Sequence, residues 1–170
     1  SQVTTREETK IASGAAIRIN AHNVVLDMNG HRLGNGAAGT ENAARGVLVA
    51  NDLGQGYQNV SLRNGTIRGF QIGVYIYGTG SQGHLVEDML IDQNLMLGIF
   101  VEGNGSMLRR NRVVSTGRTS TLNTFATGLT AMGVGITVAE NEISSTAAKM
   151  DAFGIQVSGS GVIVTGNRIN

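Results

Sequence analysis

The sequence of 170 residues contains no cysteine, no proline and no tryptophan, and its formal net charge is only +1. The absence of cysteine excludes a disulfide framework, thiolate chemistry and a cysteine-based zinc site. A net charge this close to zero gives no electrostatic reason to expect a nucleic acid or an anionic membrane as a partner. We therefore expect the protein to bind neither.

Long apolar runs are missing as well. No run approaches the roughly 18 residues with which a helix spans a bilayer. Ser1 is not followed by the basic and apolar regions of a secretory signal peptide, so we expect that any targeting segment has been removed or never existed. The length predicts one soluble domain with its own core.

Glycine is abundant, with 25 of the 170 residues, whereas aromatic residues make up only 4% of the chain. Glycine at this level without proline fits neither collagen nor a proline-rich disordered tail. The composition instead indicates many tight turns, because glycine adopts left-handed backbone conformations at little cost.

Two short phrases recur along the chain. The first is a glycine followed by an apolar, a variable and an apolar residue, and its copies are GVLV at 46, GVYI at 73, GIFV at 98, GLTA at 128 and GIQV at 154, with AIRI at 16 as a variant. The second, often with an asparagine, is LRNGTI at 62, VEDMLI at 86, LRRNRV at 108, VAENEI at 138 and VTGNRI at 164, with a longer version at 26. Both alternate inward and outward side chains, as a short strand does.

Copies of the first phrase start 30, 27, 25, 30 and 26 residues apart. An irregular period of this size, with short strands and variable loops, is typical of a solenoid in which each repeat is one coil. We therefore predict an all-β, single-stranded, right-handed parallel β-helix of about six coils over residues 16–170, with residues 1–15 as a cap or lead-in. An antiparallel sandwich also uses short strands but does not require one phrase to recur at one interval.

The segments NVVLDMNGHRLGNG, NVSLRNGTIRGFQIGVYI and GNGSMLRRNRVVSTG resemble the right-handed parallel β-helix repeats of the pectin-lyase-like superfamily. Such repeats occur in carbohydrate-active enzymes, in periplasmic NosD-like proteins and in phage tailspikes. The resemblance covers residues 16–170 and implies the fold and an extracellular or periplasmic location. It does not fix an activity, because one fold hosts many functions.

Charged residues of the second phrase align from coil to coil with alternating sign, as in the column Arg63, Glu87, Arg109 and the column Arg112, Glu142, Arg168. We interpret them as scaffold, because opposite charges on neighbouring strands pair. In pectate lyases of the resembled family, carboxylates hold calcium and an arginine acts as the base, so Glu87 and Asp88 beside Arg109 and Arg110 keep that alternative open. We otherwise expect no cofactor and no metal site, because the three histidines lack ligand spacing. The stacked Asn111, Asn141 and Asn167 predict a ladder of side-chain amides.

The outward positions of the first phrase predict a binding surface. Tyr75, Tyr77, Phe100 and Glu102 fall on adjacent coils between two long connections, 34–45 and 114–127. An aromatic floor with polar walls suits a glycan, because sugar rings stack on aromatic side chains. Arg45, Arg118 and Lys149 lie in or beside loops where they would meet uronate or sulfate groups. The alternative is that the loops or a neighbouring subunit cover this patch.

Two functions follow as hypotheses. The first is recognition of an acidic polysaccharide, with the lyases, hydrolases and epimerases of the resembled family as precedents. Glycoside hydrolysis needs two carboxyl groups, and the candidates are Glu102 with Asp92 or Asp151. The second is a structural or assembly module that forms homo-oligomers through the helix ends or the aromatic face, because an open last strand recruits other strands.

Overall fold

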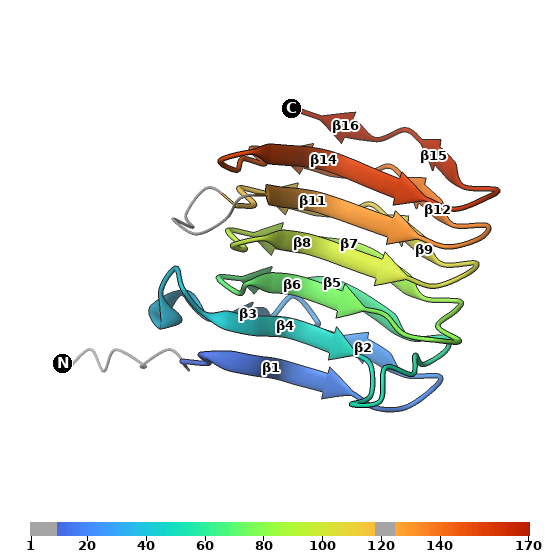
Figure 1. The fold of residues 1–170 in the computed structure, drawn as a ribbon, viewed down its shortest axis with the longest axis horizontal. Coiled ribbons are helices and arrows are strands. Elements are labelled where there is room, and N and C mark those ends of the chain that lie inside the picture. Colours follow the sequence, from blue (N-terminus) through green and yellow to red (C-terminus); the bar gives the residue numbers. More distant parts are fainter. Residues whose placement is uncertain (1–9, 118–124) are drawn as a thin grey trace.

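The computed structural model describes residues 10–117 and 125–170, and these residues form a parallel β-solenoid of six coils. Successive strands run left to right in front, and the chain returns behind them while it rises from the N to the C terminus (Figure 1). This winding is right-handed, and the predicted fold is confirmed. Of the predicted cap or lead-in in residues 1–15, residues 1–9 lie outside the described residues. β1 begins at Ser13, shortly before the first phrase.

One strand of each coil belongs to a six-stranded parallel sheet, here called sheet A. Its strands are β1 (Ser13–Ile19), β4 (Ala43–Val49), β6 (Ile72–Ile76), β8 (Leu97–Glu102), β11 (Phe125–Met132) and β14 (Asp151–Ser158), in that order. These strands contain the first phrase. The phrase recurs because each copy must lie in register on the copy before it.

The second phrase forms sheet B, which has ten strands. Its members are β2 (Val25–Asp27), β3 (Arg32–Gly34), β5 (Ser61–Arg68), β7 (Leu85–Asp92), β9 (Met107–Arg109), β10 (Arg112–Val114), β12 (Thr137–Ala139), β13 (Glu142–Ser144), β15 (Ile163–Thr165) and β16 (Arg168–Ile169). Within the described ranges the only helical segment is the 3-10 turn η1 (Gly36–Ala38), and no helix there could cross a membrane.

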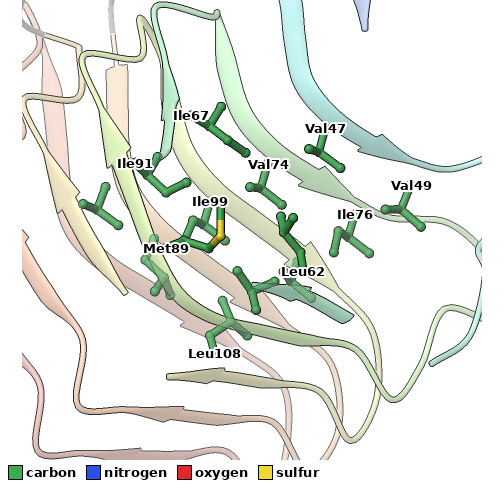
Figure 2. Close-up of a cluster of buried hydrophobic side chains, with 14 of the residues drawn as sticks. Val47, Val49, Leu62, Ile67, Val74, Ile76, Met89, Ile91, Ile99 and Leu108 are labelled. Carbon is green, nitrogen blue, oxygen red and sulfur yellow. The ribbon is translucent and has the colours of Figure 1, made fainter. Parts of the chain in front are cut away.

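Apolar side chains from both sheets fill the interior. Figure 2 shows Val74, Ile76 and Ile99 of sheet A packed against Leu62 and Met89 of sheet B. Four of these five side chains are 0% exposed and Met89 is 2% exposed. The interior is therefore a packed apolar core.

A sharp bend inside the second phrase lies at the same place in successive coils. The backbone is left-handed at Asn64, Asp88, Arg110 and Glu140, with φ between 51° and 60°. Residues other than glycine are uncommon in the left-handed conformation. In two coils the next residue is a buried asparagine whose side chain replaces the backbone hydrogen bonds lost at the bend.

The predicted asparagine ladder is confirmed. Asn141 Nδ2 donates to Asn167 Oδ1 at 2.9 Å and to the Leu108 carbonyl at 2.9 Å. Asn141 Oδ1 accepts from the backbone N–H of Asn111 at 3.0 Å and from its Nδ2 at 2.9 Å. Since Asn111 and Asn141 are each 1% exposed, the ladder satisfies polar atoms that would otherwise destabilise the fold.

The predicted charge columns are also present. Arg63, Glu87 and Arg109 pair in register, as do Arg112, Glu142 and Arg168. Glu87 Oε2 lies 2.8 Å from the guanidinium groups of both Arg109 and Arg110. Arg110 also binds Asp88 at 2.8 Å, and this contact lowers the pKa of the Asp88 carboxyl. These carboxylates are therefore neutralised by arginine.

Candidate functional site

Register in sheet A brings the predicted aromatic residues together on its outer side. Tyr75 pairs directly with Phe100 on the next coil, and their ring centroids lie 5.1 Å apart at 65°. The Tyr75 and Tyr77 centroids lie 4.5 Å apart. We call these three residues the aromatic cluster. All three are half-buried, so each ring keeps part of its surface open to a ligand.

Arg45 borders the aromatic cluster. Its guanidinium carbon lies 5.8 Å from the centroid of the Tyr75 ring, within reach of a cation–π interaction. Arg45 Nε is buried and has no hydrogen-bond partner within residues 10–117 and 125–170. Burial raises the pKa of Tyr75, so this phenol keeps its proton at neutral pH and can donate a hydrogen bond.

A hollow of about 430 Å³ opens beside Arg45 on the outer side of sheet A. This hollow, called the arginine hollow, is lined by Gly14, Ala15, Arg18, Arg45, Leu48, Asp52 and Tyr77. Arg18 forms an ion pair with Asp52 across its rim. Its walls thus combine an apolar floor, an aromatic ring and one guanidinium without a carboxylate partner among the described residues.

A second hollow, of about 330 Å³, lies where the strands of sheet A end. This glutamate hollow is lined by Glu102, by the polar residues Thr79, Ser81, Gln82, Asn104 and Ser158, by Met132 and by five glycines. Glu102 is exposed, and it pairs in register with Met132. Tyr77 of the aromatic floor and Glu102 therefore line two different hollows, which the sequence did not reveal.

Asp92 and Asp151 lie away from Glu102. Asp92 ends β7 in sheet B, where its carboxylate lies 3.4 Å from Arg68. Asp151 begins β14, whereas Ser158 at the other end of that strand aligns with Met132 and so with Glu102. Ser158 lies seven positions after Asp151 along the strand, which corresponds to roughly 23 Å. Neither aspartate therefore forms a carboxyl pair with Glu102.

Lys149, another predicted ligand-binding residue, lies apart from the aromatic cluster. Lys149 is exposed just before β14, four coils along the axis from Arg45, which corresponds to roughly 19 Å. Arg118 and most of the predicted wall after residue 117 lie outside the described residues. Within the described residues no three histidine, aspartate or glutamate side chains gather as a metal ion would require.

Two phenylalanines on the outer face escaped the sequence analysis. Phe153 pairs with Thr127 in the column that contains Arg45, and Phe125 pairs with Asp151. Each phenylalanine is 44% exposed. Both precede the glycine of the first phrase. No alternation signal marked them, because Phe153 lies two residues before the core position Ile155 and strict alternation would turn it inward.

His84 is a buried polar residue next to the glutamate hollow. It is 1% exposed, and its Nε2 lies 2.8 Å from the hydroxyl of Ser81. Its backbone N–H donates to the hydroxyl of Ser106 at 3.1 Å. Burial lowers the pKa of His84 to about 4, so the ring is neutral at pH 7 and holds the corner between the sheets.

In comparisons with known proteins, no family model, no curated protein and no solved structure matches this chain. The parallel solenoid is established by the strand pairing of the structure itself.

Proposed function

We propose that the protein binds an acidic polysaccharide on the outer face of sheet A, as carbohydrate-active β-helices of the resembled pectin-lyase-like superfamily do. The observation that carries this proposal is Arg45, which faces the arginine hollow beside the aromatic cluster. Polysaccharides with acid groups are found outside the cytoplasm, so we also propose an extracellular or periplasmic location.

Arg45 differs from most of the described arginines. Each of six others has a carboxylate oxygen within 4 Å: Arg18, Arg63, Arg68, Arg109, Arg110 and Arg112. No carboxylate of the described chain pairs with Arg45. A guanidinium binds a carboxylate or sulfate through charge-assisted hydrogen bonds. Arg45 is thus suited to the acid group of a sugar.

The aromatic cluster supplies the second half of the recognition. Apolar faces of sugar rings pack on half-buried aromatic rings, and the Tyr75 phenol can bond a hydroxyl. Because the cluster and the arginine hollow share Tyr77, one ligand can contact both. The expected ligand is an extended acidic oligosaccharide.

Binding without cleavage is the activity we propose. Glycoside hydrolysis uses two carboxyl groups about 5 to 9.5 Å apart, and the strand register aligns neither Asp92 nor Asp151 with Glu102. Calcium is not part of the proposal, because Glu87 and Asp88 are both engaged by Arg110.

Isothermal titration with an oligogalacturonate and a neutral oligosaccharide of matched length tests this function. Arg45→Gln should weaken binding of the acidic ligand by about tenfold, the loss of one charge-assisted contact. Arg63→Gln is the matched control, because Arg63 is an exposed sheet B arginine paired with Asp27. Equal affinities for both ligands, or an equal loss in the two variants, would count against an acid-recognition site at Arg45.

The contribution of the aromatic cluster to binding is tested by the double variant Tyr75→Ala, Phe100→Ala. It should lower affinity for both oligosaccharides, because stacking does not depend on the acid group. Val25→Ala, at a residue 61% exposed in sheet B, controls for loss of a surface apolar side chain. Unchanged binding in the double variant would exclude the aromatic cluster as the floor.

A further inference from the structure

Glu102 is the negative counterpart of Arg45 on the outer face of sheet A. Its carboxylate lines the glutamate hollow, and no hydrogen bond or ion pair within residues 10–117 and 125–170 engages it. Glu87 of sheet B, by contrast, is held by two arginines. The Glu102 carboxylate is therefore open to a ligand.

The aromatic cluster lies between these two charges. Arg45 aligns with Ile72, three positions before Tyr75, whereas Glu102 lies two positions after Phe100. Five strand positions and two coils separate Arg45 from Glu102, or roughly 19 Å between their Cα atoms. Burial is the main cause of the raised pKa of Tyr75, and the Glu102 charge raises it further while Arg45 opposes the shift. A ligand lying on the cluster thus meets opposite charges at its two ends.

The glutamate hollow also presents hydrogen-bond donors. The Val60 N–H donates to His84 Nδ1 at 3.4 Å, so His84 Nε2 carries the proton and donates to the Ser81 hydroxyl at 2.8 Å. Ser81 lines the hollow, and its own O–H is left to donate to a ligand. Asn104 Oδ1 accepts from the Val134 N–H at 2.9 Å, which leaves the Asn104 NH2 group as a second donor. The hollow therefore combines one anionic acceptor with two neutral donors.

This combination discriminates among the groups that a polysaccharide can offer. A carboxylate of the ligand has no proton to donate and is repelled by Glu102. An ammonium group can pair with Glu102, but it cannot accept from the two donors. A sugar hydroxyl both donates and accepts, and neighbouring hydroxyls of one ring can do both at once. The groups of the hollow thus match an uncharged sugar.

We propose that the ligand is a heteropolysaccharide in which uncharged sugars separate the acidic ones, and that the glutamate hollow is the subsite for an uncharged sugar. This inference rests on the function proposed above and names its substrate class. Arg45 takes the acid group of one sugar, and Glu102 accepts hydroxyl groups of an uncharged sugar further along. Met132, which is 37% exposed and pairs in register with Glu102, provides an apolar wall. A polymer with an acid group on every sugar would place a carboxylate beside Glu102 and is disfavoured.

Isothermal titration with two hexasaccharides tests this subsite. One alternates glucuronate with N-acetylglucosamine, and the other is hexagalacturonate. The wild-type protein should bind the alternating ligand at least about fivefold more tightly. Glu102→Gln should weaken binding of the alternating ligand and strengthen that of hexagalacturonate, each by about threefold, because glutamine keeps the shape without the charge. Glu140→Gln, at an exposed glutamate in the bend of sheet B, should change neither affinity.

Arg45→Gln separates failure of this subsite from failure of the proposed function. It should weaken both ligands alike, since each presents an acid group to Arg45. No loss for either ligand would contradict the proposed function, and the subsite with it. Loss for both, with an affinity ratio that Glu102→Gln leaves unchanged, would overturn the subsite alone. Tighter binding of the alternating ligand after removal of its acetyl groups would assign an ammonium group to the hollow and would also overturn it.

Intermolecular NOEs provide a second readout that needs no variant. In the complex with the alternating hexasaccharide, the Met132 methyl group should show NOEs to protons of the N-acetylglucosamine rings. The methyl group of Met150, which is 75% exposed just before β14, should show none. NOEs from Met132 to glucuronate protons alone would contradict the assignment of the hollow to an uncharged sugar.

Discussion

Sheets A and B pass through the same six coils, but their outer faces are built differently. On sheet B, arginines and carboxylates of neighbouring coils neutralise one another, as Glu87 does with Arg109 and Arg110. On sheet A, the outer face carries aromatic rings and an arginine with no carboxylate partner among the described residues. The paired charges of the first face therefore stabilise the stack, and the second face is the one on which we propose ligand binding.

The two sheets also differ in what allows one coil to approach the next. In sheet B the asparagine ladder satisfies buried polar atoms at the bend. In sheet A a column of glycines lets the backbones come close, since a Cβ on Gly98 would lie 2.4 Å from the Gly128 carbonyl oxygen. Glycine in the first phrase is thus a packing requirement rather than a turn.

The largest expected effect tests this packing requirement. Gly98→Ala should lower the free energy of unfolding by about 3 kcal/mol, because the added methyl overlaps the Gly128 carbonyl and Val113. Gly105→Ala is the matched control: its Cβ would meet nothing within 4 Å, and only the left-handed backbone, worth about 1 kcal/mol, opposes it. Urea denaturation measures both, and equal losses would show that close approach is not what selects glycine.

The corner between the sheets should make stability depend on pH. His84 has a pKa of about 4 in the folded protein and an ordinary value of 6.5 when unfolded. Stability is therefore complete above pH 6.5 and falls by up to about 3 kcal/mol as the pH approaches 4, because the unfolded chain takes up the proton first.

Urea denaturation at several pH values measures this slope. His84→Gln should remove the dependence between pH 6.5 and 4 but not the steeper loss at lower pH. That loss belongs to carboxyls such as Asp27 and Asp88, whose pKa values are lowered. An unchanged slope in His84→Gln would assign the effect to another group.

A smaller effect distinguishes the paired charges within sheet B. Glu87→Gln should cost about 1 to 2 kcal/mol, because Glu87 is 7% exposed and accepts from two arginines. Glu142→Gln should cost less than about 0.5 kcal/mol, because its partner Arg112 lies 3.9 Å away at an exposed position. Similar losses in the two variants would mean that burial does not set the strength of these pairs.

The smallest expected change in stability concerns two arginines, Arg45 on the outer face of sheet A and Arg112 on that of sheet B. Arg45→Gln and Arg112→Gln should each change the free energy of unfolding by less than about 0.5 kcal/mol, because neither loses a strong pair. Only Arg45→Gln should alter binding of the oligogalacturonate. A large loss of stability in Arg45→Gln would assign this residue to the scaffold.

Much of this architecture was predictable because the repeat encodes it. A parallel stack places equivalent residues above one another, so the pairing of Tyr75 with Phe100 and the Asn111, Asn141 and Asn167 ladder followed from aligning the phrases. Inward and outward positions followed from strand alternation.

Most of the features that the sequence did not reveal lie outside the two repeated phrases, in turns and corners that differ from coil to coil. The ion pair of Arg18 with Asp52 joins residues 34 positions apart through a turn that other coils do not share. The separation of Tyr77 and Glu102 into two hollows depends on glycine-rich corners of differing shape. The left-handed conformation of Arg110 and Glu140 is set by the stack, because neither residue type favours it, whereas the aspartate at position 88 adopts it more readily.

The central claim is that the outer face of sheet A, and not that of sheet B, binds acidic glycans. The most direct measurement is the change of backbone amide NMR signals during titration with an oligogalacturonate. Signals of Arg45, Tyr75, Tyr77 and Phe100 should shift together and saturate with one dissociation constant, while those of Arg63, Glu87 and Arg109 stay in place. Shifts confined to sheet B, or no saturable shift on sheet A, would contradict it.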